Sequence, residues 1–412
     1  MKKIILLSFL LVNFAAISQD KIPYIDYETI VEEVTKFSND KDYSKALESL
    51  NKISKNDSTY CSILTSKSYY LIQQKKYKAA IEVSDEGLQL NCESSSQLFL
   101  MMNKGVALEK LEKYQDAITI YDKALEIFPA NHKLWFNKAT CYEKMDDIPK
   151  AIAAYQEVIT ISPLYRNAHL FLGNICYKQN LTTQALMCYN MALMVEPDSE
   201  RAFALLKYVN EAISGKNENE ANDELVVSED DEAFEDIDLI LDNRIALSND
   251  YKVDHDIDIA LVKQSHAILE QLEDFEGNGG FWDKRYVPIY KWIKESKQFN
   301  DFVYTLVYSI KNEKLKKLVA KKTDNVTAFM ARLISKSYDV MSPQEKMIDG
   351  TEKDINYYFL EGVLQGEGQM NGETTIGDWV YYNINGKING KGGYDNKGER
   401  HGKWSWYHNN GK

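Results

Sequence analysis

A step of 34 residues recurs through the middle of the chain. Four positions keep it over three consecutive units: an alanine (Ala117, Ala151, Ala185), a tyrosine (Tyr121, Tyr155, Tyr189), a proline (Pro129, Pro163, Pro197) and a small residue (Gly105, Ala139, Gly173). The alanine and the tyrosine are four residues apart, so on a helix they lie one turn apart on the same face. The proline ends that helix because it has no amide hydrogen to donate. The pattern therefore predicts an array of similar helical units.

The 34-residue period resembles the tetratricopeptide repeat, in which two helices joined by a turn form each unit. The resemblance implies that the glycine or alanine of each unit lies on the first helix and lets the second helix approach. Ala46 and Ala80 extend the array by two weaker units, and three extra residues fit in the polar loop around 91–96. We expect a solenoid over residues 27–213. Its five units lie at about 27–60, 61–97, 98–131, 132–165 and 166–199, and a closing helix from Arg201 to Ile213 covers the last exposed face.

The first 18 residues have the pattern of a secretory signal peptide. Lys2 and Lys3 precede an apolar run from Ile4 to Ala16, which is too short to span a membrane. Cleavage is predicted before Gln19, so we expect an exported protein that is periplasmic, associated with the cell surface or secreted. No later apolar run approaches the length of a membrane span, and the sequence therefore predicts no transmembrane span after cleavage.

Acidic residues gather after the predicted solenoid. The net charge of −13 argues against nucleic acid or an anionic membrane surface as the main partner. Residues 217–258 hold 16 Asp and Glu against Arg244 and Lys252. We interpret residues 214–231 as an acidic linker, and we expect proteases to cut it and release the solenoid as a stable fragment. Residues 232–337 show helical periodicity without the 34-residue step and resemble no family that we recognise.

A second repeat, with a step of 25 residues, lies near the C-terminus. Gly377-Asp378-Trp379 recurs as Gly402-Lys403-Trp404, and an Asn-Gly pair follows each copy, at 385–386 and 410–411. Asn-Gly between aromatic-rich segments predicts a β-hairpin. The pattern resembles MORN-type repeats, especially the bacterial antitoxin-like variant, and implies a β tail over residues 355–412. The predicted fold class is therefore mainly α: a tetratricopeptide α-solenoid, a second helical region and a small antiparallel MORN-like tail.

The sequence contains no recognisable catalytic or cofactor motif. It has no Gly-x-Ser-x-Gly elbow, no phosphate-binding loop and no His-Glu-x-x-His. The six histidines are not spaced as metal ligands on one helix, and the five cysteines include no CxxC pair. Gly366 and Gly368 miss the spacing of a dinucleotide-binding loop, so we expect them to turn strands instead. The sequence predicts a protein that is not an enzyme, with no cofactor, no catalytic residues and no metal site.

The tetratricopeptide resemblance implies a binding function, because stacked helical pairs form a concave groove lined by the first helix of each unit. The predicted groove residues are Tyr69, Phe99, Met102, Val106, Lys133, Phe136, Thr140, Leu170, Asn174 and Tyr177. Apolar and aromatic side chains dominate this set, which suits an amphipathic or extended peptide more than a highly charged ligand. The alternative is that some of these residues pack against the next unit.

Two of the cysteines occupy the ends of one predicted helical pair. Cys61 opens the first helix of its unit, and Cys92 follows the end of the second. Those ends meet in a helical hairpin, so an oxidising compartment would favour a disulfide between them. The other alternative is that both stay free, because the three-residue insertion leaves the position of Cys92 open. Cys141, Cys176 and Cys188 are interpreted as small buried hydrophobic residues.

These patterns together predict an exported scaffold that binds a protein or peptide partner. The alternative function is an antitoxin or immunity-type protein that acts through the β tail. The signal peptide and the long solenoid argue against an intracellular antitoxin. Neither the identity of the partner nor the oligomeric state follows from the sequence.

Overall fold

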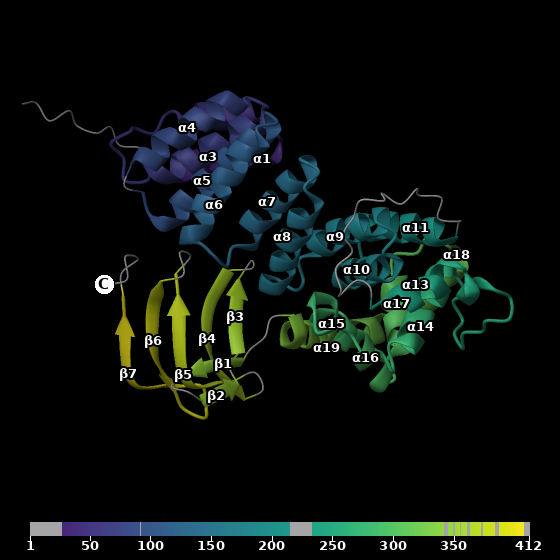
Figure 1. The fold of residues 1–412 in the computed structure, drawn as a ribbon. Helices are drawn as coiled ribbons and strands as arrows, with labels where there is room; N and C mark the ends of the chain where they lie inside the picture. The colour runs from purple at the N-terminus through teal and green to yellow at the C-terminus, as the bar shows by residue number, and fades with distance from the viewer. Residues whose placement is uncertain are drawn as a thin grey trace, which may run out of the picture.

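The computed structural model shows an array of helical pairs, a second helical region and a strand meander (Figure 1). It describes residues 27–90, 92–214, 233–341, 345–348, 351–354, 356–360, 363–371, 374–383 and 387–407. The predicted signal peptide, residues 215–231 of the predicted linker and both Asn-Gly pairs lie outside these residues. The predicted fold class, mainly α with a small antiparallel sheet, is confirmed. Across the described residues, no helix is both long and apolar enough to cross a membrane.

Within residues 27–214, ten helices form five consecutive pairs, and an eleventh helix closes the array. The pairs are α1 (Tyr27–Asn39) with α2 (Tyr43–Leu50), α3 (Tyr60–Gln73) with α4 (Tyr77–Gln89), α5 (Ser94–Lys110) with α6 (Tyr114–Ile127), α7 (His132–Lys144) with α8 (Ile148–Ile161), and α9 (Arg166–Lys178) with α10 (Thr182–Val195). The closing helix is α11 (Glu200–Ser214). These pairs follow the 34-residue units of the sequence closely.

The recurring small residues lie where the helices of a pair touch. Ala117 and Ala151 are completely buried. A Cβ atom added to Gly105 on α5 would lie 2.3 Å from Cε1 of Tyr121 on α6, which is closer than two carbon atoms can approach. The tyrosine ring of the second helix therefore fills the space that the small residue of the first helix leaves open.

One residue in the left-handed conformation joins the two helices of each pair. Lys41, Lys75, Glu112, Asp146 and Asn180 all have φ between 58° and 60°. In each pair the next residue donates its amide hydrogen to the carbonyl five positions back, as Lys113 does to Leu108 at 3.0 Å. The turns are the same although the left-handed residues differ, so the packing of the helices overrides the local steric cost of this conformation.

The second helical region consists of short helices that follow residue 233. They are α13 (Glu235–Asp242), the 3-10 helix η1 (Ile245–Leu247), α14 (Ala260–Gln271), α15 (Phe281–Arg285), α16 (Val287–Glu295), α17 (Phe299–Leu306), α18 (Glu313–Ala320) and α19 (Thr323–Met341). The predicted core cluster of this region is confirmed, because Trp282 and Tyr286 are buried and the ring of Trp292 stacks on that of Phe329 at 5.8 Å.

The second helical region packs directly on α10, the last helix of the array. Every side chain from Thr182 to Met194 is buried, although one face of a solenoid's second helix is normally exposed. The amide of Asn190 donates hydrogen bonds to the hydroxyls of Ser265 (2.9 Å) and Tyr290 (3.0 Å). One continuous hydrophobic cluster accordingly runs from Ala139 to Met341. The last repeats and the second helical region therefore share one core (Figure 1).

Helices α16 and α17 repeat the turn of the tetratricopeptide units. Lys297 between them has φ of 56°, and the next amide, that of Gln298, donates to the Ile293 carbonyl five residues back at 3.0 Å. Phe299 then begins α17, just as a tyrosine begins α2, α4 and α6. This helical pair has the same connection as the five units, but it lies outside the 34-residue step and was not predicted.

The strands form a hairpin and a meander. The hairpin pairs β1 (Glu345–Ile348) with β2 (Thr351–Asp354). The antiparallel meander contains, in chain order, β3 (Asn356–Leu360), β4 (Val363–Asn371), β5 (Thr374–Tyr382), β6 (Ile388–Tyr394) and β7 (Arg400–Trp406). The expectation that Gly366 and Gly368 turn strands is wrong, because both lie within β4. A Cβ atom on Gly368 would lie 2.4 Å from the ring of Trp379, so this glycine makes room for the indole on the neighbouring strand.

Candidate functional site

The ten predicted groove residues lie on four successive first helices. Tyr69 is on α3; Phe99, Met102 and Val106 are on α5; Lys133, Phe136 and Thr140 are on α7; Leu170, Asn174 and Tyr177 are on α9. None is buried, and Tyr69 and Phe99 are the most exposed of them, at 45% each. Their role in binding stays a prediction.

Phe136 differs from the other predicted groove residues because it also packs between units. Its ring centroid lies 5.6 Å from that of Tyr155 on α8 and 5.3 Å from that of Phe171 on α9. A third ring, that of Tyr165, is 5.3 Å away at 75°. Such edge-to-face contacts stabilise the stacking of the units. Phe136 therefore has a structural role in addition to its exposed edge.

The structure contains a groove of about 520 Å³ between α9 and α11. Three predicted residues, Leu170, Asn174 and Tyr177, line one side of it. The other side comes from α11, whose lining residues Arg201, Ala204, Leu205 and Tyr208 were not predicted. The sequence analysis treated α11 only as a cover for the last unit. Its exposed apolar and aromatic residues were the available signal.

The aromatic end of this groove is formed by Tyr177 and Tyr208. Their rings meet edge to face at 6.4 Å, and the ring of buried Tyr189 meets that of Tyr208 at 6.3 Å. The hydroxyl of Tyr189 donates to Oδ1 of Asn174 at 3.0 Å, which fixes the amide at the groove surface. Tyr208 is 47% exposed, so a large part of its ring is open to a ligand.

The opposite end of the groove is polar and holds two arginines around one carboxylate. Arg201 Nη2 donates to both oxygens of Glu196 at 2.8 Å, and Arg166 Nε lies 3.7 Å from the same carboxylate. Burial alone would raise the pKa of Glu196, but the hydrogen bonds from Arg201 outweigh it and leave the pKa below its ordinary value. Burial also lowers the pKa of Arg166. The carboxylate is therefore held ionised between the two guanidinium groups.

The chemistry of this groove is that of a binding surface. It combines an apolar floor and aromatic rings with charged groups at the rim. Within the described residues, no group of three or more His, Cys, Asp or Glu side chains could hold a metal ion.

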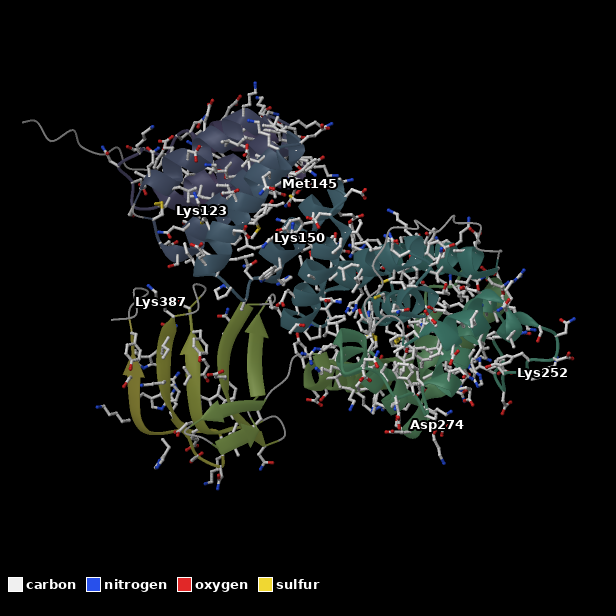
Figure 2. The ribbon with its side chains drawn as sticks, in the orientation of Figure 1. Lys123, Met145, Lys150, Lys252, Asp274 and Lys387 are labelled. Carbon is white, nitrogen blue, oxygen red and sulfur yellow. A yellow bond between two sulfur atoms is a disulfide. The ribbon has the colours of Figure 1, made fainter. Side chains whose placement is uncertain are left out.

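Cys61 and Cys92 are bonded to each other in the structure. Their Cα atoms lie 5.7 Å apart, and 31 residues separate them in the chain. The bond joins the start of α3 to the segment after α4, and it is drawn as a yellow bond in Figure 2. The other three cysteines are free and buried, as their interpretation as small hydrophobic residues requires.

His169 lies in the shared core, and nothing in the sequence singles it out. Its side chain is completely buried. The Pro163 carbonyl oxygen is 2.8 Å from Nε2 and can only accept, so Nε2 carries the proton and Nδ1 accepts from the Tyr286 hydroxyl at 2.6 Å. The Tyr286 oxygen in turn accepts from the Cys188 thiol at 3.3 Å. Burial lowers the pKa of His169 to about 4.

We expect His169 to make the protein less stable in acid. Between about pH 6.5 and pH 4 the unfolded chain binds a proton at this position that the folded chain does not bind. The stability present above pH 6.5 is therefore lost as the pH falls through this window, by about 3 kcal/mol in all. His169→Gln, which cannot titrate there, should flatten the fall in urea-unfolding free energy between pH 7 and pH 4.5. The exposed His401→Gln is the control, and equal slopes for the two variants would contradict the assignment.

Comparisons with known proteins agree with the repeat architecture. A search among curated proteins finds no match. A solved structure of MamA from Desulfovibrio magneticus RS-1 is 17% identical, covers 42% of this chain and 96% of its own, and has a TM-score of 0.36. A structure of YrrB, described as a TPR protein with an unusual peptide-binding site, is 18% identical, covers 44% of this chain and 90% of its own, and has a TM-score of 0.34. At these values the likenesses carry no argument about function.

Two family models match the central units of the array. One covers residues 99–131 and the other residues 132–164, and both describe the tetratricopeptide repeat. Neither match reaches the strands, so the MORN-type resemblance of the C-terminal region stays a prediction. Residues 99–164 of this chain are two consecutive tetratricopeptide repeats.

Proposed function

We propose that this protein is an exported scaffold that binds a peptide or protein segment along the first helices of its repeats. The observation that carries the proposal is the groove between α9 and α11, which continues the surface of predicted groove residues on α3, α5 and α7. Exposed aromatic side chains on such a surface are unfavourable in water and are the residues that dominate the energetics of protein interfaces. A segment that covers them would gain the free energy of their burial.

Two observations support export. The N-terminal sequence has a basic start and a short apolar run, as a signal peptide does. The bonded pair Cys61–Cys92 suits an oxidising compartment such as the periplasm or the cell exterior, where disulfides persist. The proposed location is therefore the periplasm, the cell surface or the medium.

The proposed function is tested by capture of partners from a cell-envelope fraction. The variant Leu170→Ala/Tyr208→Ala should retain at least about tenfold less of any protein that wild type retains, because each truncation of an interface anchor costs about 1–2 kcal/mol. Its melting temperature should change little, since both side chains are partly exposed. Phe136→Ala should instead lower the melting temperature, because its ring packs against Tyr155 and Phe171.

Met145→Ala is the matched control for this capture. Met145 is 42% exposed and follows α7 at the turn to α8, away from the groove lining (Figure 2). Its truncation removes a similar apolar area and should leave capture unchanged. Equal capture by wild type and the double variant, or an equal loss with Met145→Ala, would contradict the groove as the binding surface.

A further inference from the structure

The groove between α9 and α11 has features that specify the chemistry of its ligand. We propose that it binds a segment of a partner protein in which an apolar side chain is flanked by acidic side chains. This inference rests on the proposed function and narrows the class of partner. It concerns the α9–α11 groove alone and not the rest of the concave surface.

The floor of the groove is apolar and partly open. Leu170 of α9 and Ala204 and Leu205 of α11 form it, with the rings of Tyr177 and Tyr208 at one end. Leu205 is buried at 5% exposure, so it belongs to the helix contact, whereas Leu170 and Tyr208 remain accessible. A groove of about 520 Å³ with such a lining favours an aliphatic or aromatic side chain over a polar one.

The rim of the groove carries more positive than negative charge. Arg166, Lys178 and Arg201 line it, against Glu143 in the lining and the adjacent Glu196. Both carboxylates are already engaged, because Glu143 accepts from the Tyr155 hydroxyl at 3.0 Å and Glu196 is shared by the two arginines.

The cations at the rim are accessible to a ligand. Lys178 is exposed, and the side chain of Arg201 is 65% exposed although it binds Glu196. A guanidinium has five N–H donors, so Arg201 keeps donors for a second carboxylate. In a protein of net charge −13, a rim of this sign attracts acidic groups to a place that the rest of the surface would repel them from.

The chain itself contains a sequence of the required chemistry. Residues 222–232 place Leu225-Val226-Val227 between acidic residues on both sides. We use this sequence as the probe because it has the proposed pattern. Occupation of the groove by the chain's own copy is an alternative that the experiment separates from binding of a partner.

The experiment measures binding of a fluorescein-labelled peptide with the sequence of residues 222–232 to the full chain, by anisotropy at low salt. Two control peptides carry Asn and Gln in place of every acidic residue, or Ser in place of Leu225, Val226 and Val227. Each change should weaken binding by about tenfold or more, which corresponds to about 1.4 kcal/mol. Raising the salt concentration should weaken the acidic peptide but not the neutral one.

Matched protein variants locate the interaction. Lys178→Glu/Arg201→Glu should weaken the acidic peptide by about tenfold or more and leave the neutral peptide unchanged. Lys207→Glu makes the same charge change on α11, but Lys207 pairs with Glu211 and does not line the groove, so it should change the affinity less than about twofold. A chain with Leu225→Ser, Val226→Ser and Val227→Ser is measured in parallel to remove any competition from its own copy.

The outcomes are distinct. Binding that depends on the acidic residues, on the apolar triplet and on Lys178 and Arg201 supports the proposal. If it occurs only with the serine-substituted chain, the chemistry is supported and the chain's own segment is the competitor. Equal binding of the neutral peptide, or no binding to either chain, overturns the inference. Should capture of envelope partners still depend on Leu170 and Tyr208 in that case, the proposed function stands without this ligand class.

Discussion

A chain that ends at Ser214 is expected to lose the fold of its last two repeats and to aggregate. The truncation removes α13, α14, α16 and α17, which cover the outer face of α10. Met187, Met191 and Met194 would then lose the cover that buries them completely, and exposing each such side chain costs about 1.5–3 kcal/mol. Asn190 would also lose its two hydrogen-bond partners in the second helical region. The summed loss is a large part of the stability of an ordinary domain.

The measurement compares three forms of the protein by circular dichroism and size-exclusion chromatography. A chain that ends at Met341 keeps the whole helical core and is the control that should stay folded and monodisperse. Full-length protein cleaved by a protease within residues 215–232 should elute as one particle, because the two pieces share a core. A soluble, fully helical fragment that ends at Ser214 would show that the array is independent after all, as the composition of the linker alone suggests.

Loss of the bond between Cys61 and Cys92 is expected to destabilise the N-terminal repeats by about 3–4 kcal/mol. The closed loop of 31 residues restricts the unfolded chain, and that restriction disappears when the bond is reduced. Neighbouring units contribute stability pairwise in such arrays, so the loss should be concentrated in α3 and α4. Hydrogen exchange with and without dithiothreitol should show faster exchange in these two helices than in α8.

The variant Cys61→Ser/Cys92→Ser provides the control for this measurement. It should exchange like the reduced wild type, and dithiothreitol should then have no further effect on it. The buried thiols of Cys141, Cys176 and Cys188 are present in both proteins and cannot account for a difference between them. Identical exchange of oxidised and reduced wild type would show that the bond adds no stability.

The array was predictable because its signals are local and repeated. Each unit places a small residue, such as Gly105, opposite an aromatic one, such as Tyr121, at a fixed offset, and the contact between them lies within one helical pair. The side chains that face away from the pair are then exposed by elimination. This is why the ten predicted groove residues are partly or largely exposed in the structure.

The contacts between distant parts of the chain were not predictable in the same way. The sequence from Thr182 to Val195 is apolar around the whole helix, which indicates a second cover for α10 but not which segment provides it. His169 and Tyr286 meet across 117 residues, so no periodic pattern connects them. The α11 side of the groove was missed for a related reason: the closing helix lies outside the 34-residue step, and its Tyr208 has no counterpart in the units.

The burial of α10 on both sides makes the two ends of the array unequal as sites for growth. A repeat protein normally lengthens by insertion of a unit anywhere along its axis, since each unit contacts only its neighbours. Here a unit inserted after Pro197 would separate α10 from α11, although α11 and α14 are themselves in contact. A unit inserted near residue 131 would move only the N-terminal repeats, because the cluster shared with the second helical region begins at Ala139. Changes in repeat number are therefore compatible with the fold only toward the N-terminus, and the α9–α11 groove stays at a constant distance from the closed end.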